Sequence, residues 1–595
     1  MGLSSTLSNA LGGMNASQRG IDVVSRNIAN KGTPGYHRQS MVIEETAYGT
    51  SAQVRASTLT RAFSEALEKQ HLVAVSQTSY HATRASFLDR LQMHMGQPGD
   101  ANSLDTLYAG FENALQALAT NPNDVTTRAG VINAAQHLVE QLNTLTGAVQ
   151  EMRQEAESQI ANSVSELNRE LTQLADVNVR ILDQSQDQQA RLSLMDERDR
   201  LVASISEKID VKASYRADGS VALMTDTGIG ILDVEASQFN FRSGGALNSG
   251  AGAVGQLTLR TPSGFEIDLT GKGLLGSGRL AALLELRDTT LPNMQDQLDE
   301  IAAGLAQAMN TVTTDGEAVP GGFAVDLDDP APGNSFTFSY TDGTGTHSYR
   351  VVHSSEGTAG PLPPNAAGET IVRMDLSDLD AAAGALNALF PGVDFSQASA
   401  GRLQVVGAGA TVTGLTATTT PKGTGAGGAV NLFVDTHNTP FSNGLDGGGQ
   451  KQGFAGRISV NTALIANNEG LVRDDASVSL GDATRPNQLL ASLKGMVFVS
   501  DKITAVSDGG VRLKGRVTEL IGQMINHQGN VVAKAQSQHA AAGYTLQSIT
   551  TRMSAEYGVN VDEEMARLMQ LQNAYAASAR VVSTVQELID SLLRM

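Results

Sequence analysis

Two stripes of apolar and small residues, one at each end of the chain, dominate the pattern of hydrophobic and polar positions. The first advances by alternating steps of four and three through Leu3, Leu7, Ala10, Met14, Ser17, Ile21, Val24 and Ile28. The second shows the same alternation through Leu568, Leu571, Tyr575, Ser578, Val582, Val585, Ile589 and Leu592. This is the spacing of a coiled-coil seam. We therefore expect a helix at each terminus, each with one face that needs a partner.

A third stripe predicts long helices in the first half of the chain. No proline occurs between Pro122 and Pro262. Within this interval the stripe contains Leu138, Leu142, Leu145, Val149, Met152, Ala156, Ile160, Val164, Leu167, Leu171 and Leu174. A further helical region is expected at about 277–310, where Pro292 suits a first helical turn. These segments predict a helix bundle or rod.

Strand patterns lie between the helical segments. Asp218-Gly219 and Asp342-Gly343 each follow a short run of alternating residues and predict hairpin turns. From about 318 to 450 the chain is rich in Gly, Thr, Ala and Pro, with one short helix expected at 378–389 behind a Ser377 cap. This stretch is predicted to be a mainly β insertion.

The predicted fold class is multidomain α+β. Both termini and the 60–210 region are expected to form a core of long helices, with mainly β outer domains inserted. The expected division, in chain order, is an assembly helix with an extended arm (1–60), a helix bundle (61–210), a hairpin and helical segment (211–317), a variable outer insertion (318–455), a return segment (456–556) and a C-terminal assembly helix (557–595).

The stretch "NIANKGTPGYHRQ", residues 27–39, ends the first helix abruptly. Asn30 and Gly32 can each adopt the left-handed conformation that ends a helix, and Pro34 moves Thr33 out of the helical region. Pro34 and Gly35 then fit the centre of a type II turn. Alternation from Ser40 to Glu44 predicts that an extended arm leaves this corner.

Composition and charge narrow the classes of partner. The 62 acidic and 42 basic residues give a net charge of -20, which disfavours nucleic acid and anionic membrane surfaces as partners. The absence of cysteine excludes disulfides and thiolate sites and is compatible with an oxidising compartment. No secretory signal pattern and no run of 18 apolar residues is present. We expect protein partners and no membrane insertion, and any export would have to proceed without a cleavable signal.

Candidate chemistry is sparse. Two GxGxxG stretches, at 250–255 and 423–428, precede strand-like runs instead of helices, so they are interpreted as loops and not as nucleotide sites. "MDERDR", Met195 to Arg200, is interpreted as a solvated face with ion pairs. The prediction is a protein that is not an enzyme, with no catalytic residues, no cofactor and no metal.

The corner motif resembles the signature of the rod and hook family of bacterial flagellar axial proteins. Its "TPGYxRQ" form is kept in Thr33, Pro34, Gly35, Tyr36, Arg38 and Gln39, preceded by Asn30. Four further stretches, beginning at Arg198, Gly278, Gly456 and Tyr557, are similar to the same family in the same order. The resemblance covers about residues 1–310 and 455–595, and within the family it favours the hook-associated proteins.

The resemblance implies a structural role in the flagellum. Proteins of this family leave the cell through the flagellar type III export apparatus and assemble as a helical tube lined by their terminal helices. The implied partners are further copies of this chain, the hook protein, the next hook-associated junction protein and an export chaperone. The implied location is the extracellular junction between hook and filament, with this chain as its first layer.

The two terminal stripes are the predicted assembly seams. We expect Val582, Val585, Ile589 and Leu592 to pack against Leu7, Met14, Ile21 and Val24, with Leu568, Leu571 and Tyr575 continuing the C-terminal seam. Isolated stripes of this kind order when neighbouring subunits cover them. A secreted adhesin with a coiled-coil stalk is the alternative function, although it does not require the corner motif.

Overall fold

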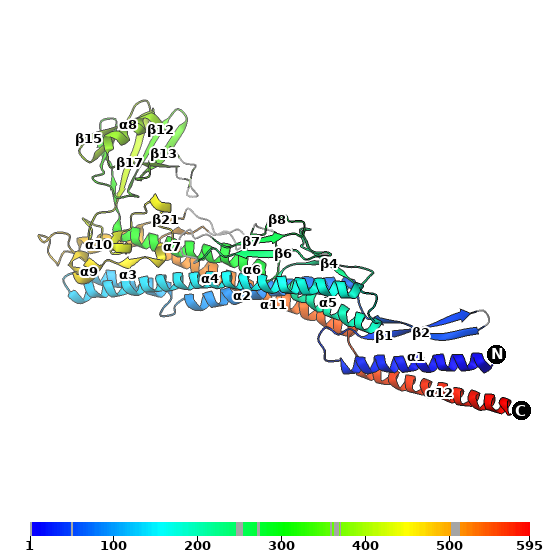
Figure 1. Ribbon diagram of the computed structural model, residues 1–595. Coiled ribbons are helices and arrows are strands. Elements are labelled where there is room, and N and C mark those ends of the chain that lie inside the picture. Colours follow the sequence, from blue (N-terminus) through cyan, green and yellow to red (C-terminus); the bar gives the residue numbers. More distant parts are fainter. Residues whose placement is uncertain are drawn as a thin grey trace.

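The computed structural model describes residues 3–48, 51–245, 254–270, 274–357, 360–361, 364, 368, 370–500 and 512–594. The longer helices are α1 (Leu3–Ala29), α2 (Glu65–Met95), α3 (Leu104–Thr120), α4 (Val125–Leu182), α5 (Gln188–Lys208), α7 (Leu291–Asn310), α11 (Val517–Tyr557) and α12 (Val561–Leu593), and the shorter ones are α6 (Arg279–Glu285), α8 (Leu379–Leu389), α9 (Thr462–Ala466) and α10 (Thr484–Gly495). They form a long rod that carries a β domain near one end and a helical hairpin at the other (Figure 1).

The strands form small sheets. Those of the arm and the rod are β1 (Gln39–Tyr48), β2 (Ser51–Arg61), β3 (Lys212–Tyr215), β4 (Val221–Met224), β5 (Gly230–Leu232), β6 (Gln238–Arg242), β7 (Gln256–Arg260), β8 (Glu266–Asp268), β18 (Phe433–Asp435), β19 (Thr439–Pro440), β20 (Ser459–Val460), β21 (Phe498–Val499) and β22 (Lys514–Gly515). Those of the outer domain are β9 (Val312–Asp315), β10 (Glu317–Val319), β11 (Gly322–Asp326), β12 (Ser335–Asp342), β13 (Gly345–His353), β14 (Thr370–Met374), β15 (Val393–Ser399), β16 (Arg402–Gly407) and β17 (Thr411–Thr419).

Helix α4 is the longest helix of the rod. Its 58 residues extend over about 87 Å at the rise of an α-helix. All eleven residues of the stripe from Leu138 to Leu174 are buried in one continuous core with residues from α2, α3, α5, α7 and α11. The predicted rod is therefore confirmed, and the stripe faces its partner helices along its whole length.

Two helical features of the rod depart from the sequence prediction. The helical region at 277–310 is interrupted by a π-helical turn, Leu286–Thr290, before Pro292 opens α7. The sequence pattern does not predict the long helix α11, because the residues between Ala535 and Tyr557 are mostly exposed polar and small ones. Packing on α2, more than its own pattern, defines its second half.

The outer domain has its own hydrophobic core. Its two sheets follow the orders β14-β13-β12-β17-β9 and β10-β11-β16-β15, with α8 packed against β15. The core residues lie between Val325 and Ala417. Both predicted hairpin turns are present, at β3–β4 and β12–β13, and α8 begins one residue later than expected, capped by Asp378 instead of Ser377.

The predicted boundary of the outer insertion at 455 is wrong. Val430, Leu432, Phe433, Phe441 and Phe454 belong to the core of the rod and not to that of the outer domain. Phe433 packs edge-on against Phe111 of α3, with 5.5 Å between ring centroids. This stretch is rich in Gly and has few aliphatic residues, so its pattern does not predict a buried segment. It returns to the rod through aromatic side chains.

The terminal helices form a separate hairpin. Helices α1 and α12 run side by side in opposite directions beyond the end of the rod, next to the β1–β2 ribbon (Figure 1). Neither helix contributes a residue to the rod core, which begins at Leu72. The multidomain α+β class is confirmed, and the structure shows that the two terminal helices pack against each other instead of joining the 60–210 bundle.

Candidate assembly site

The corner motif forms two consecutive turns after α1. The amide of Thr33 donates to the carbonyl of Asn30 at 2.9 Å, and the amide of Tyr36 donates to the carbonyl of Thr33 at 3.2 Å. Gly35 has a φ of 73°, as the predicted type II turn requires. Asn30 and Gly32 do not adopt the left-handed conformation, because the two turns already satisfy the end of the helix.

Asn27, in the last turns of α1, is the centre of this corner. Its side chain is fully buried. Its amide nitrogen donates to the carbonyl of Gln39 at 2.9 Å and to the carboxylate of Glu564 at 3.1 Å. Its amide oxygen accepts from the backbone of Gln39 at 3.0 Å and from the Tyr36 hydroxyl at 2.8 Å. An asparagine side chain has two donors and two strong acceptor positions, so its capacity is fully used.

Tyr557 marks the elbow between α11 and α12. Its carbonyl accepts from the amide of Arg38 at 2.9 Å. Its hydroxyl accepts from the amide of Ser64 at 3.0 Å and donates to the carbonyl of the same residue at 2.9 Å. Arg38 also reaches Glu563 at 3.5 Å, although both side chains remain partly exposed. The chain segments around residues 38, 64 and 557 are therefore tied together at one point.

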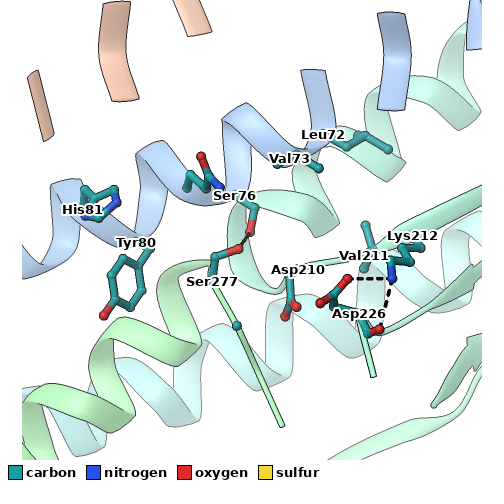
Figure 2. A pocket seen from close by; sticks show the side chains of 12 residues that line it. Leu72, Val73, Ser76, Tyr80, His81, Asp210, Val211, Lys212, Asp226 and Ser277 are labelled. Carbon is teal, nitrogen blue, oxygen red and sulfur yellow. Dashed lines mark hydrogen bonds and ion pairs between the residues drawn. The ribbon is translucent and has the colours of Figure 1, made fainter. Parts of the chain in front are cut away.

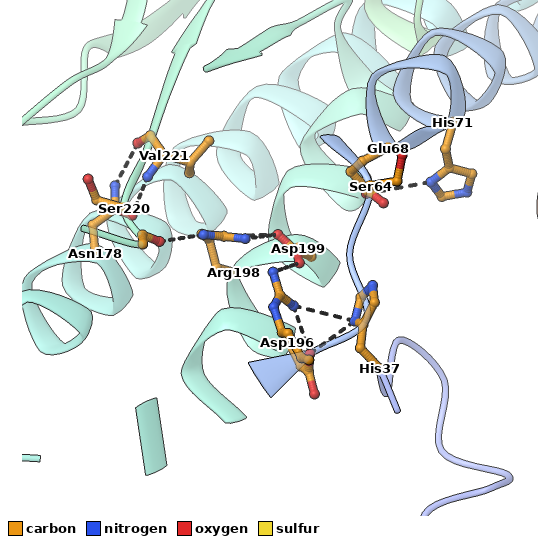
Figure 3. A network of polar contacts seen from close by, with 12 residues as sticks. His37, Ser64, Glu68, His71, Asn178, Asp196, Arg198, Asp199, Ser220 and Val221 are labelled. Atoms are coloured by element: carbon orange, nitrogen blue, oxygen red, sulfur yellow. Dashed lines mark hydrogen bonds and ion pairs between the residues drawn. The ribbon is translucent and has the colours of Figure 1, made fainter. Parts of the chain in front are cut away.

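A cluster of charged side chains lies beneath the corner (Figure 3). Arg61 contacts Asp196 at 2.8 Å and Asp199 at 2.6 Å, and His37 lies 3.0 Å from Asp196. Arg198 donates to Asp199 through two nitrogens, at 2.9 and 2.7 Å. The interpretation of "MDERDR" as a solvated face is wrong for these residues, because the ribbon and the β3–β4 turn cover this part of α5.

The pKa values follow from this burial. Burial by itself lowers the pKa of Arg61, but Asp199 and Asp196 outweigh this effect and hold the pKa above its ordinary value. Burial is also the main reason that the pKa of Tyr36 rises to about 12, with a further contribution from Asp196. Both groups therefore keep their ordinary charge states at neutral pH.

The two terminal helices pack in a regular antiparallel register. A Cβ atom on Gly20 would lie 3.0 Å from the methyl groups of Leu571, and one on Gly13 would lie 3.1 Å from the Ser578 hydroxyl. The hydrogen bond between Asn27 and Glu564 continues this series. Moving seven residues toward the end of α1 therefore corresponds to moving seven residues toward the start of α12. Small residues on α1 allow this close approach.

This register corrects the expected pairing of the seams. Ile21 and Val24 lie level with the segment around Leu568 and Leu571, and not with Ile589 or Leu592. A repeating seam pattern does not define the offset of one helix along its partner.

The predicted seam residues differ in how far they are covered within the single chain. Val24 and Val585 are buried, and Leu592 is 61% exposed. The partly buried members are Leu7, Met14, Ile21, Leu568, Leu571, Tyr575, Val582 and Ile589. Of the motif residues, Thr33, Pro34 and Gly35 are exposed and Gln39 is buried, while Asn30, Tyr36 and Arg38 are partly buried.

Helix α12 exposes further apolar side chains outside the seam. They are Met565, Met569, Val581, Leu588 and Leu593, all more than 40% exposed. A groove of about 340 Å³ lies on the other side of the hairpin, between α1, the ribbon and the start of α5; Arg19, Asp22, Arg26, Met41 and Leu59 line it. The hairpin thus offers uncovered surface on more than one side.

A larger cavity of about 520 Å³ lies along the rod between α2, the start of β3 and the loop before α6 (Figure 2). Two pairs of its lining side chains contact each other, Ser76 with Ser277 and Lys212 with Asp226. In the described part of the chain, no group of three or more His, Asp or Glu residues is arranged to hold a metal ion. No helix within the same residues combines the length and hydropathy needed to cross a membrane.

The sequence predictions missed Asn27, Arg61, Asp196 and Tyr557 as members of the site. A polar residue close to the apolar stripe of α1 was the available signal for Asn27. The other three are brought together only by the fold.

Three family profiles match separate parts of the chain. Residues 88–328 match the flagellar hook-associated protein FlgK helical domain. Residues 7–37 match the flagella basal body rod protein family, and residues 553–595 match the flagellar basal body rod FlgEFG protein C-terminal family. The last two matches coincide with α1 and its corner and with the elbow and α12.

Similar proteins span the whole chain. Flagellar hook-associated protein 1 of Salmonella typhimurium is 24% identical over 618 residues, covering 100% of both chains. The proteins of the same name from Escherichia coli and Bacillus subtilis are each 22% identical; the first alignment covers 100% of both chains, and the second covers 99% of this chain and 97% of the relative. Among solved structures, the flagellar hook junction protein FlgK from Burkholderia pseudomallei aligns with a TM-score of 0.43 and 14% identity, over 82% of this chain and 99% of that one.

Proposed function

Because the chain belongs to the flagellar hook-associated protein 1 family, we propose that it forms the first junction layer between hook and filament by helical self-assembly through its terminal hairpin. The observation that carries this proposal is the apolar surface that the hairpin leaves uncovered. Met569 and Leu588 on α12 are 57% and 49% exposed. A helix with apolar residues outside its intramolecular seam gains stability when neighbouring copies cover them.

The rod and the outer domain support the proposal by their independence from the hairpin. Each has a core without a residue from α1 or α12. The hairpin can therefore be devoted to contacts with other subunits. The proposed neighbours are further copies of this chain, the hook protein on one side and the next junction protein on the other. The proposed location is the extracellular part of the flagellum, and we propose no catalytic activity and no cofactor.

A truncation tests the proposal. In a strain that lacks the gene, the full chain should restore filaments, and a chain without residues 561–595 should leave hooks without filaments. The truncated chain should retain a folded rod, because the rod core ends at Ala535. Retention of filaments by cells with the truncated chain would refute the role of the hairpin.

A point variant separates loss of the interface from loss of the helix. Leu588→Lys places a charge on the exposed apolar surface and should reduce the number of cells with filaments. Glu587→Lys introduces the same side chain at the neighbouring exposed position and should keep filaments. Equal filament counts for the two variants would contradict a contact at Leu588.

A further inference from the structure

The start of β1 and the end of β2 are both attached to the rod through one carboxylate, that of Asp196. His37 lies just before β1, and Arg61 ends β2, where it pairs with Gln39 in the ribbon register. The ring nitrogen Nδ1 of His37 lies 3.0 Å from Oδ1 of Asp196, and Nη1 of Arg61 donates to the same oxygen at 2.8 Å. All three side chains are only 6% exposed.

The rod supplies this carboxylate from helix α5 and holds the neighbouring Asp199 through its own side chains. Asp196 lies on α5, one turn before Asp199, which accepts two hydrogen bonds from Arg198. Arg198 also donates to the carbonyl of Gly219 in the β3–β4 turn, and its guanidinium lies 4.8 Å from the centre of the Tyr215 ring. These groups belong to the rod, so a site with two carboxylates and one arginine exists before the ribbon is added.

Arg61 supplies the missing positive charge. It bridges Asp196 and Asp199, and its guanidinium lies 4.7 Å from the centre of the Phe63 ring. Two carboxylates then face two guanidinium groups in a buried environment. Removing one member of such a set leaves a buried charge without full compensation.

The same attachment extends to the C-terminal helix. The His37 ring lies against that of Tyr557, with 4.9 Å between centroids, and the neighbouring amide of Arg38 donates to the Tyr557 carbonyl. Tyr557 ends α11, immediately before α12 begins. The position of His37 on Asp196 therefore also determines where the elbow of α12 lies.

We propose that Asp196 is the positioning residue that fixes the direction in which the terminal hairpin and the ribbon leave the rod. The hairpin has two covalent connections to the rod, at Phe63–Ser64 and at the elbow, and both lie beside this cluster. This inference rests on the proposed function, because a fixed direction matters only if the hairpin docks against neighbouring subunits.

Distance measurements between two spin labels test the proposal on the full chain. The natural sequence contains no cysteine, so Asn15→Cys on α1 and Glu207→Cys on α5 give two unique labels at exposed positions. The wild-type background should give one narrow distance distribution. Asp196→Asn should widen it at least twofold without changing the melting temperature of the rod, and Asp196→Glu should restore part of the narrow component.

Asp176→Asn is the matched control, since it changes an exposed carboxylate on α4. It should reproduce the wild-type distribution. A distribution for Asp196→Asn as narrow as that of the control would overturn the proposal, and so would a wild-type distribution as wide as that of Asp196→Asn.

A second readout separates this inference from the proposed function. Filament retention by cells carrying each variant should be normal for Asp176→Asn and reduced for Asp196→Asn. If the unlabelled wild-type chain fails to restore filaments, the proposed junction role fails, and the distances still decide the role of Asp196. If Asp196→Asn widens the distances but retains wild-type filament numbers, the positioning role in assembly is overturned and the junction role stands.

Discussion

Asn27 and Glu564, separated by 537 positions in the sequence, share a buried hydrogen bond of 3.1 Å that joins the last turns of α1 to the first turn of α12. Glu564 is buried and lies near the positive end of α12, where the helix dipole also stabilises its charge. This contact sets the offset between the two terminal helices, because Asn27 adjoins the corner after α1 and Glu564 adjoins the elbow before α12. The terminal hairpin is therefore defined at its base, and the rest of its seam follows in register.

Replacement of Asn27 should loosen this base. Asn27→Ala removes the partner of the Tyr36 hydroxyl and of both backbone groups of Gln39, at a cost of about 3 kcal/mol in the stability of the hairpin. Hydrogen exchange measured by mass spectrometry should show faster exchange in α1 and α12 and unchanged exchange in α4. Asn15→Ala, at an exposed position of α1, serves as the control and should leave exchange in both helices unchanged.

Gly35 should not tolerate a side chain. A Cβ atom there would lie 2.5 Å from Cγ of Arg200, and the φ of 73° costs an L-residue about 1–2 kcal/mol in addition. Gly35→Ala should therefore reduce filament retention and increase cleavage by protease at the corner. A Cβ atom on Gly32, three positions before Gly35, would have no atom within 4 Å, so Gly32→Ala should behave as wild type. Equal protease sensitivity in the two variants would show that the turn is not constrained.

The stability of the rod should depend on the charge of Asp299. Its carboxylate accepts from the amides of Gly453 and Ala455 at 2.7 and 2.9 Å, yet burial raises its pKa from 3.8 to about 6. The folded protein thus retains a proton that the unfolded chain releases between about pH 4 and pH 6. Its free energy of unfolding should fall by about 3 kcal/mol from this group as the pH rises through that interval.

Comparison with Asp299→Asn isolates this dependence. The variant cannot titrate, so its stability relative to wild type should increase between about pH 4 and pH 6 and then become constant. Denaturant unfolding at a series of pH values measures the difference. Asp394→Asn, which removes an exposed carboxylate in the outer domain, should show no such change. A constant difference between wild type and Asp299→Asn would contradict the raised pKa.

The two hydrophobic cores should unfold separately. Phe338 is fully buried among Phe390, Phe395 and Tyr349 in the outer domain. Phe338→Ala should cost about 3–5 kcal/mol and lower only the outer-domain transition in calorimetry. Leu167→Ala in α4 should lower only the transition of the rod. A single transition shifted by both variants would show that the two cores unfold together.

Several parts of the structure depend on local pattern and were predictable without the fold. The stripe from Leu138 to Leu174 specified α4, because a helix with one apolar face can bury it in only one way. Pro34 and Gly35 specified the corner, because their backbone preferences hold in any surroundings. The terminal stripes likewise predicted a helix at each end of the chain.

Other features depend on contacts between distant segments and became visible in the folded chain. The offset of α1 along α12 follows from Asn27, Gly20 and Leu571, since a repeating seam allows several offsets of similar energy. Burial of Asp196 and Asp199 required Arg61 to arrive from the ribbon, because a carboxylate remains in water unless a partner replaces its solvent. The sequence shows that these two residues carry carboxylates, but only the fold shows that the carboxylates are buried.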